Sequence, residues 1–208
     1  MGIYLELIKA QVKLAFKNSF FLTIIFLGLT PFIFGVQNLD NIASAMVLER
    51  YISLIGILLL VPILVPEQNE NIGELVEVKK ISMVSVYGLR LLIGSAFLLV
   101  FLSISVVVLQ SNNCQFPAIE FLFGTFVTAF VLGNLGLVAY GFSKNITVGY
   151  LIPLVYYILN YTIGRKFKNG YLFSLSMGSM REKYWLLGIA GLLMLAVLGF
   201  EYMIRRIR

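Results

Sequence analysis

Four glutamates between residues 66 and 82 form the most suggestive pattern of functional side chains in this sequence. They recur at intervals of three, four and three residues, at Glu67, Glu70, Glu74 and Glu77. This spacing places all four on one face of an α-helix. Three apolar residues fall on the other side: Ile72, Leu75 and Val76. An acidic stripe of this kind is typical either of a solvated interfacial helix or of an element that docks on a basic surface.

The sequence lacks the side chains that most catalytic and metal sites need. It contains no histidine, which excludes Ser-His triads, Cys-His pairs, HExxH zinc sites and histidine ligands to haem. Its single cysteine, Cys114, can form neither an internal disulfide nor a metal cluster. No G-x-x-x-x-G-K-[ST] run is present, so the chain has no P-loop for ATP. We therefore expect no enzymatic activity and no cofactor bound by this chain.

The composition indicates that lipid is the solvent of this protein. The chain is 60% hydrophobic and only 12% charged, whereas soluble domains average about 25% charged residues. So few charges cannot cover a soluble surface, and we expect a single all-α transmembrane domain over residues 1–208. Six apolar runs are interpreted as transmembrane helices, at about residues 20–36, 42–65, 84–109, 119–141, 148–163 and 185–203.

Residues 1–18 are predicted to form an amphipathic helix on the membrane surface. Glu6 and three lysines share one face of this helix: Lys9, Lys13 and Lys17. Apolar side chains lie away from that face. A basic stripe beside a broad apolar face is typical of a helix that lies in the headgroup layer.

The balance of positive charge predicts both termini in the cytoplasm. Six spans place the two ends of the chain on one side. With the ends inside, ten cations lie in inner segments and six in outer segments, as the positive-inside rule favours. Residues 66–82 are then cytoplasmic, where anionic lipids repel acidic side chains. A basic partner surface explains the four glutamates better than solvation alone.

Several charged residues lie within or near the predicted spans. Glu49 and Arg50 fall in the outer half of the second span, where adjacent opposite charges are costly unless they face protein or water. Glu49, Glu120 and Glu201 are all expected near span ends and solvated. Arg90 is expected to extend its side chain to the inner headgroups.

The loop of residues 164–184 is predicted to be the longest between spans. Its apolar part, residues 171–180, is too short to cross a membrane and is expected either to dip into it or to lie along the interface. Lys183 is assigned to this outer loop. In the fourth span, three glycines are expected to permit close helix packing: Gly124, Gly133 and Gly136.

The chain resembles the ABC-2-type permeases, the membrane subunits of bacterial ABC exporters. The resemblance rests on an amphipathic helix before the first span, on six spans, and on the run PEQNENIGELVEVKKISMVSVYGLRLL. It implies that residues 66–82 form a cytoplasmic coupling helix seated in a cleft of a separate P-loop ATPase subunit. Glu67, Glu70, Glu74 and Glu77 would be its charged contacts, with Ile72, Leu75 and Val76 packing behind them. Residues 1–18 would be an elbow helix, with Lys9, Lys13 and Lys17 beside the same subunit.

The resemblance further implies a permease subunit of an ATP-driven exporter in the bacterial cytoplasmic membrane. ATP and magnesium would be bound by the ATPase subunit. A second permease chain, either a copy or a homologue, would complete the pathway, and no nucleic acid would be bound. Aromatic and aliphatic spans suit an amphipathic or hydrophobic cargo, such as a peptide, a lipid or a drug.

Two other functions fit the sequence. One is the six-span substrate-binding component of an importer, although the first span, FFLTIIFLGLTPFIFGV, lacks the alanine small-xxx-small run that such components use to contact their partners. The other is a membrane protein without a transport function, such as an immunity or assembly protein.

Overall fold

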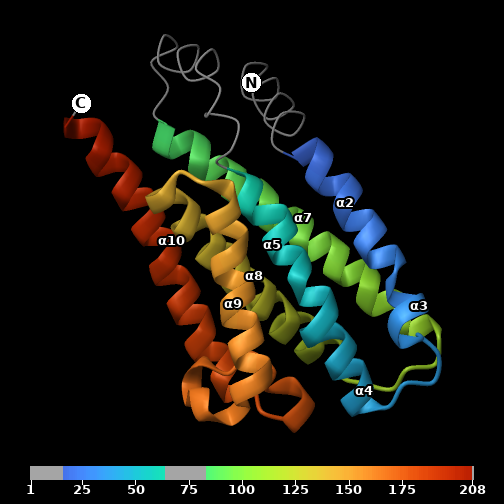
Figure 1. Cartoon of the computed structure of the whole chain (residues 1–208). Coiled ribbons are helices and arrows are strands. Elements are labelled where there is room, and N and C mark those ends of the chain that lie inside the picture. Colours follow the sequence, from blue (N-terminus) through green and yellow to red (C-terminus); the bar gives the residue numbers. More distant parts are fainter. Residues whose placement is uncertain (1–15, 64–82, 208) are drawn as a thin grey trace.

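The structure is a computed structural model that describes residues 16–63 and 83–207 of the chain (Figure 1). In these two ranges the regular elements are all helical, and no strand occurs. The elements, in chain order, are α2 Lys17–Gly28, α3 Thr30–Phe34, α4 Asn41–Met46, η2 Val47–Tyr51, η3 Ile52–Leu54, α5 Ile55–Leu60, α7 Met83–Ser111, α8 Ala118–Ser143, α9 Ile146–Ile163, η5 Gly164–Gly170, η6 Leu175–Met177 and α10 Arg181–Ile207.

Four helical stretches are long and apolar enough to cross a membrane, and they coincide with four of the predicted spans. They are Asn41–Ile63, Tyr87–Ser111, Ala118–Ser143 and Ile146–Ile163. The described chain is therefore all-helical, with four helical stretches that have the length and apolar character of membrane spans.

The first and sixth predicted spans are also helical, but the first is shorter than these four and the sixth carries more charged residues. The apolar stretch Asn18–Phe34 is shorter, because helix α2 ends at Gly28 and α3 starts anew at Thr30. Pro31 lies at the start of α3, where its missing N–H is tolerated. Helix α10 has 27 residues but carries charged residues in both of its end segments.

The helices run alternately between two ends of one bundle (Figure 1). We call one end of the bundle the termini end. It holds the start of α2, the end of the α5 stretch, the start of α7 and the C-terminal end of α10. The opposite end, the loop end, holds the loops of residues 35–40 and 112–117. These two loops are joined by hydrogen bonds from Asn38 N to Asn112 O (3.0 Å) and from Gln115 N to Leu39 O (3.3 Å).

Helix α8 is the centre of the bundle and packs against α5, α7, α9 and α10. Its closest approach is to α5, where a β-carbon built on Gly56 would lie 1.9 Å from the carbonyl oxygen of Ala129. Gly133 and Gly136 of α8 likewise leave no room for a side chain, since a β-carbon there would lie 2.5 Å from Leu60 and 2.4 Å from Val61. The predicted close packing of these glycines is confirmed, and it is the kind of contact that holds helices together in lipid.

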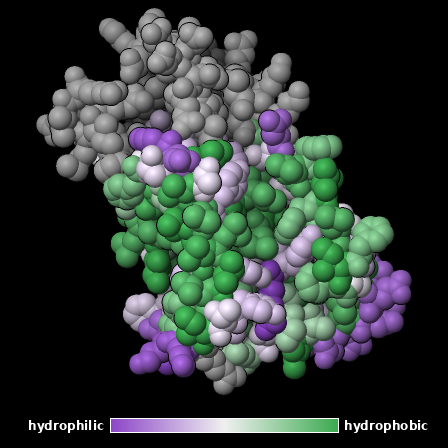
Figure 2. All heavy atoms as spheres, in the orientation of Figure 1, coloured by the Kyte–Doolittle hydropathy of each residue, from purple (hydrophilic) through white to green (hydrophobic). Residues whose placement is uncertain are grey.

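The outer surface of the bundle is apolar over a broad band (Figure 2). Phe32 is 85% exposed and Ile119 is 84% exposed, and many other large apolar side chains on α2, α7 and α9 face outward. Water would penalise so much contiguous apolar surface. Hydrocarbon is the solvent that such a surface fits, as the composition predicts.

Candidate functional site

A fully buried ion pair joins the second and last long helical stretches of the bundle. Glu49 Oε1 lies 2.5 Å from Lys183 Nζ, and neither side chain has any exposed surface. Glu49 belongs to η2, a π-helical turn in the stretch Asn41–Ile63. Lys183 lies in the first turn of α10. π-helical turns interrupt α-helices rarely and are frequent at functional sites.

The Glu49 carboxylate also binds the backbone of the segment that precedes α10. It accepts hydrogen bonds from the amide N–H of Leu175 to Oε1 (3.0 Å) and from that of Ser176 to Oε2 (3.3 Å). Both amides belong to the short 3₁₀ turn η6. The carboxylate therefore has three donors around it, which is the condition under which a buried charge can be accommodated.

The Lys183 ammonium group is likewise surrounded by hydrogen-bond acceptors. Besides Glu49, its ammonium group donates to Thr128 Oγ1 on α8 (2.6 Å) and to the carbonyl oxygen of Leu172 (2.5 Å). An ammonium group has three N–H donors, and all three have an acceptor here. With both charges paired and hydrogen-bonded, the centre is neutral and saturated.

Two side chains from α9 also form hydrogen bonds to the backbone of the same segment. Asn160 Oδ1 accepts from the amide N–H of Leu172 (3.0 Å), and the Tyr156 hydroxyl donates to the carbonyl oxygen of Gly170 (2.6 Å). Residues Tyr171–Leu175 are buried. We call residues 170–177, held in this way by side chains of the surrounding helices, the clamped segment.

The clamped segment explains why a charged pair is placed inside an apolar bundle. Its backbone is irregular, so its N–H and C=O groups cannot all bond to one another. In a membrane protein such backbone is tolerated where protein covers it and satisfies its polar groups. Glu49, Lys183 and Asn160 supply those partners. Gly124 of α8 makes room for the segment, because a β-carbon there would lie 2.7 Å from the Leu175 side chain.

This geometry corrects two predictions. Glu49 was expected to be solvated near a span end, and Lys183 was assigned to an exposed outer loop; both are completely buried. The prediction that charges at the depth of Glu49 and Arg50 must face protein or water is confirmed for Glu49. The signal in the sequence was a glutamate inside an apolar run, which requires a cation, but the sequence does not say which of sixteen cations is nearby.

Arg90 also differs from its prediction. It was expected to reach the headgroups but is fully buried, and its guanidinium donates to the carbonyl oxygen of Ile63 (2.9 Å). Ile63 is the last described residue before the 64–82 gap. Arg90 therefore ties the end of the second helical stretch to the start of α7, at the base of the acidic segment.

The predicted coupling residues lie outside the described part of the chain: Glu67, Glu70, Ile72, Glu74, Leu75, Val76 and Glu77. Lys9 and Lys13 of the predicted elbow helix lie outside it too, and Lys17 is the first residue of α2. Glu120 is exposed in the first turn of α8, as predicted.

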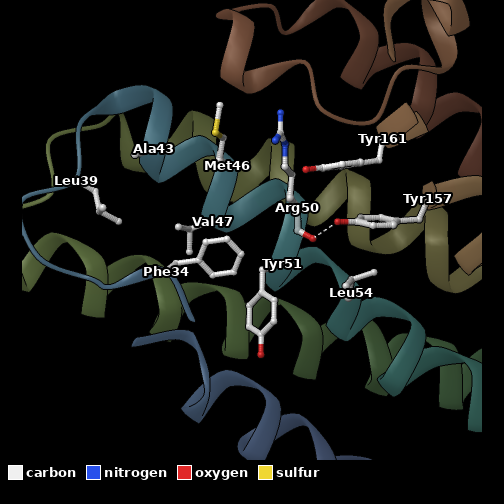
Figure 3. Close-up of a pocket in the computed structure, with 10 residues that line it drawn as sticks. All are labelled: Phe34, Leu39, Ala43, Met46, Val47, Arg50, Tyr51, Leu54, Tyr157 and Tyr161. Carbon is white, nitrogen blue, oxygen red and sulfur yellow. Dashed lines mark hydrogen bonds between the residues drawn. The ribbon is translucent and has the colours of Figure 1, made fainter. Parts of the chain in front are cut away.

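A cavity of about 400 Å³ lies beside the ion pair, between α9 and the N-terminal part of the stretch Asn41–Ile63 (Figure 3). Its lining is mainly apolar and aromatic, and Arg50 is the charged residue in it. The other lining residues are Phe34, Leu39, Ala43, Met46, Val47, Tyr51, Leu54, Tyr157 and Tyr161. Tyr157 braces the wall by donating from its hydroxyl to the carbonyl oxygen of Arg50 (2.5 Å).

Within the described residues, no group of three or more potential metal ligands is found. Comparison with known proteins gave no match: no protein-family model, no curated protein and no solved structure is significantly similar to this chain.

Proposed function

We propose that this chain is the permease subunit of an ATP-driven ABC exporter in the bacterial cytoplasmic membrane. It crosses the membrane six times with both termini in the cytoplasm, and it works with a separate P-loop ATPase and a second permease chain. Residues 1–18 form the elbow helix and residues 66–82 form the coupling helix that the ATPase holds. The cargo is amphipathic or hydrophobic.

The main support for this proposal is the position of the two ends of the acidic segment in the bundle. The end of the α5 stretch and the start of α7, which flank the acidic segment, lie at the termini end with the start of α2 (Figure 1). A β-carbon on Gly94 of α7 would touch both Ile63 (3.0 Å) and Phe16 (3.4 Å). The glutamate-bearing residues 66–82 and the basic residues 1–18 are thus attached to the same end of the bundle. A single soluble partner there can contact both.

The clamped segment, which lies at the loop end of the bundle (Figure 1), supports the same proposal. An exporter has to close its outer end while its inner end is open, and a segment fixed across the helix ends is suited to this role. Glu49 and Lys183 come from different helices, so a relative movement of the stretch Asn41–Ile63 and α10 would have to break a buried pair. Such a contact favours discrete conformations over gradual deformation.

ATP drives transport in this scheme through differential binding. The ATPase dimer closes more favourably against one conformation of the permease than against the other, and that difference shifts the bundle between its states. The permease contributes a surface that senses closure, and no nucleotide chemistry of its own.

The proposal is tested by purifying the tagged chain from its native membrane under mild detergent. We expect a partner chain that carries a G-x-x-x-x-G-K-[ST] run, in equal numbers with the permease, and vanadate-sensitive ATP hydrolysis by the complex. A chain that purifies alone, without ATP hydrolysis, from a membrane in which the adjacent genes are expressed would contradict the proposal.

A further inference from the structure

The cavity beside the ion pair combines one cation with an apolar, aromatic wall. Its volume of about 400 Å³ is within the range of small-molecule sites, which are typically about 300–1,000 Å³. The side chain of Arg50 lies in it between Met46 and Tyr161 (Figure 3). The guanidinium carbon is 5.2 Å from the centre of the Tyr161 ring and 5.8 Å from that of Phe173. Rings at these distances stabilise a cation without neutralising it.

Arg50 has hydrogen-bonding capacity left for another group. Its Nε is buried and has no hydrogen-bond partner among the described residues. The neighbouring carboxylate, Glu49, is engaged by Lys183 and by two backbone amides. None of the described residues that line the cavity is acidic. A guanidinium fork in an apolar setting without a carboxylate is suited to bind an anion.

The other residues that line the cavity indicate which kind of molecule carries the anionic group. Phe34, Leu54 and Val47 offer only hydrocarbon, and the hydroxyl of Tyr51 is already donated to the carbonyl oxygen of Phe26 (2.8 Å). Phe34 is 42% exposed and Tyr161 is 59% exposed, so the cavity opens on the side of the bundle where other apolar side chains face lipid. A molecule entering from there brings an apolar chain with it.

We infer that this cavity is a binding site for an amphipathic anion, with a carboxylate or phosphate on Arg50 and an apolar chain along Phe34, Val47 and Leu54. The same chemistry is offered by an anionic phospholipid and by a single-chain acidic amphiphile. This inference concerns binding alone and does not rest on the proposed transport function.

The test measures binding of tritiated oleate to the purified full chain in detergent by scintillation proximity. Oleyl alcohol, which has the same chain without the charge, serves as a competitor. We expect oleate to bind and the alcohol to compete at least about tenfold more weakly than unlabelled oleate, since one charge-assisted contact separates them. Equal competition by the alcohol, or no oleate binding, would overturn the inference.

Two variants locate the site. Arg50→Gln removes the charge, and Ala43→Phe fills the cavity while leaving Arg50 in place; each should weaken oleate binding by about tenfold or more. Arg181→Gln, at an exposed cation that does not line the cavity, is the matched control and should bind as the native chain does. Protection of the buried Cys114 thiol from a maleimide checks that each variant is folded. Native affinity in folded Arg50→Gln would contradict the assignment.

A final arm distinguishes the two sources of the ligand. Phosphatidylglycerol and phosphatidylcholine are titrated against bound oleate on the native chain. Displacement by phosphatidylglycerol alone identifies an anionic phospholipid as the ligand. Retention of oleate in the presence of both lipids identifies a single-chain amphiphile. Displacement by both lipids to the same extent would show that the charge is not recognised and would overturn the inference.

Discussion

The Glu49 carboxylate and the Lys183 ammonium lie 2.5 Å apart with no exposed surface on either side chain. The pair connects a π-helical turn in the second helical stretch to the first turn of α10, and between them they bind the backbone at Leu172, Leu175 and Ser176. The pair therefore fixes the clamped segment as much as it fixes the two helices.

Removing either member of the pair should be strongly destabilising. Glu49→Gln and Lys183→Met each leave the other charge buried and unpaired, which typically costs about 3–5 kcal/mol. The double variant Glu49→Gln/Lys183→Met should lose less than the sum of the two, because it leaves no unpaired charge. Unfolding is followed by the reaction of a thiol-specific fluorophore with Cys114, which is the only cysteine and is buried. Additive losses would show that the two charges do not interact.

Alanine substitutions at two glycines should change the stability of the protein in opposite directions. Gly56→Ala places a methyl group 1.9 Å from the Ala129 carbonyl oxygen, so α5 and α8 must separate; overpacking of this kind costs about 1–3 kcal/mol or more. Gly88→Ala in α7 meets no atom within 4 Å and should stabilise the helix by up to about 1 kcal/mol. The same Cys114 assay measures both. Equal effects would mean that α5 and α8 are not in close contact.

Replacing Arg90 should lower the stability of the protein more than replacing an exposed arginine. Arg90→Met removes the hydrogen bond to the Ile63 carbonyl oxygen and leaves that helix end without its cationic partner, a loss of about 1–3 kcal/mol. Arg181→Met, on the exposed surface of α10, should change stability by less than about 0.5 kcal/mol. Thermal unfolding of the two variants in detergent gives the comparison. Equal midpoints would show that Arg90 does not hold the base of the acidic segment.

The orientation in the membrane can be measured by labelling from outside. In a Cys114→Ser background, Gln37→Cys places a thiol at the loop end and Ser143→Cys places one at the termini end; both positions are exposed. An impermeant maleimide applied to intact cells should label only Gln37→Cys, and both should react after lysis. Labelling of Ser143→Cys in intact cells would reverse the proposed orientation.

The spans could be predicted from the sequence because the signal is local. An apolar run of about 20 residues specifies a helix in lipid whatever surrounds it, and the runs at 42–65, 84–109, 119–141 and 148–163 agree with the helices to within a few residues. The glycines of α8 were predictable for a similar reason, since helix contact in lipid needs small residues.

The ion pair was not predictable because it depends on long-range packing. Glu49 lies in an apolar run and Lys183 lies in a polar stretch, so the usual rules treat the first as a span-end residue and the second as a loop residue. Only the folding of the clamped segment onto the bundle brings them together. Arg90 was missed for the same reason: its partner is a backbone carbonyl of another helix, which leaves no trace in side-chain types.

Reversing the charge of the acidic segment tests whether this segment couples the chain to an ATPase. Glu70→Lys/Glu74→Lys should lower the ATP hydrolysis of the purified complex and release the ATPase subunit at moderate salt, because two attractive contacts become repulsive. Glu120→Lys, on an exposed residue at the loop end, is the matched control and should leave both properties unchanged. Unaltered ATP hydrolysis and an intact complex in the double variant would show that the acidic segment is not the coupling element.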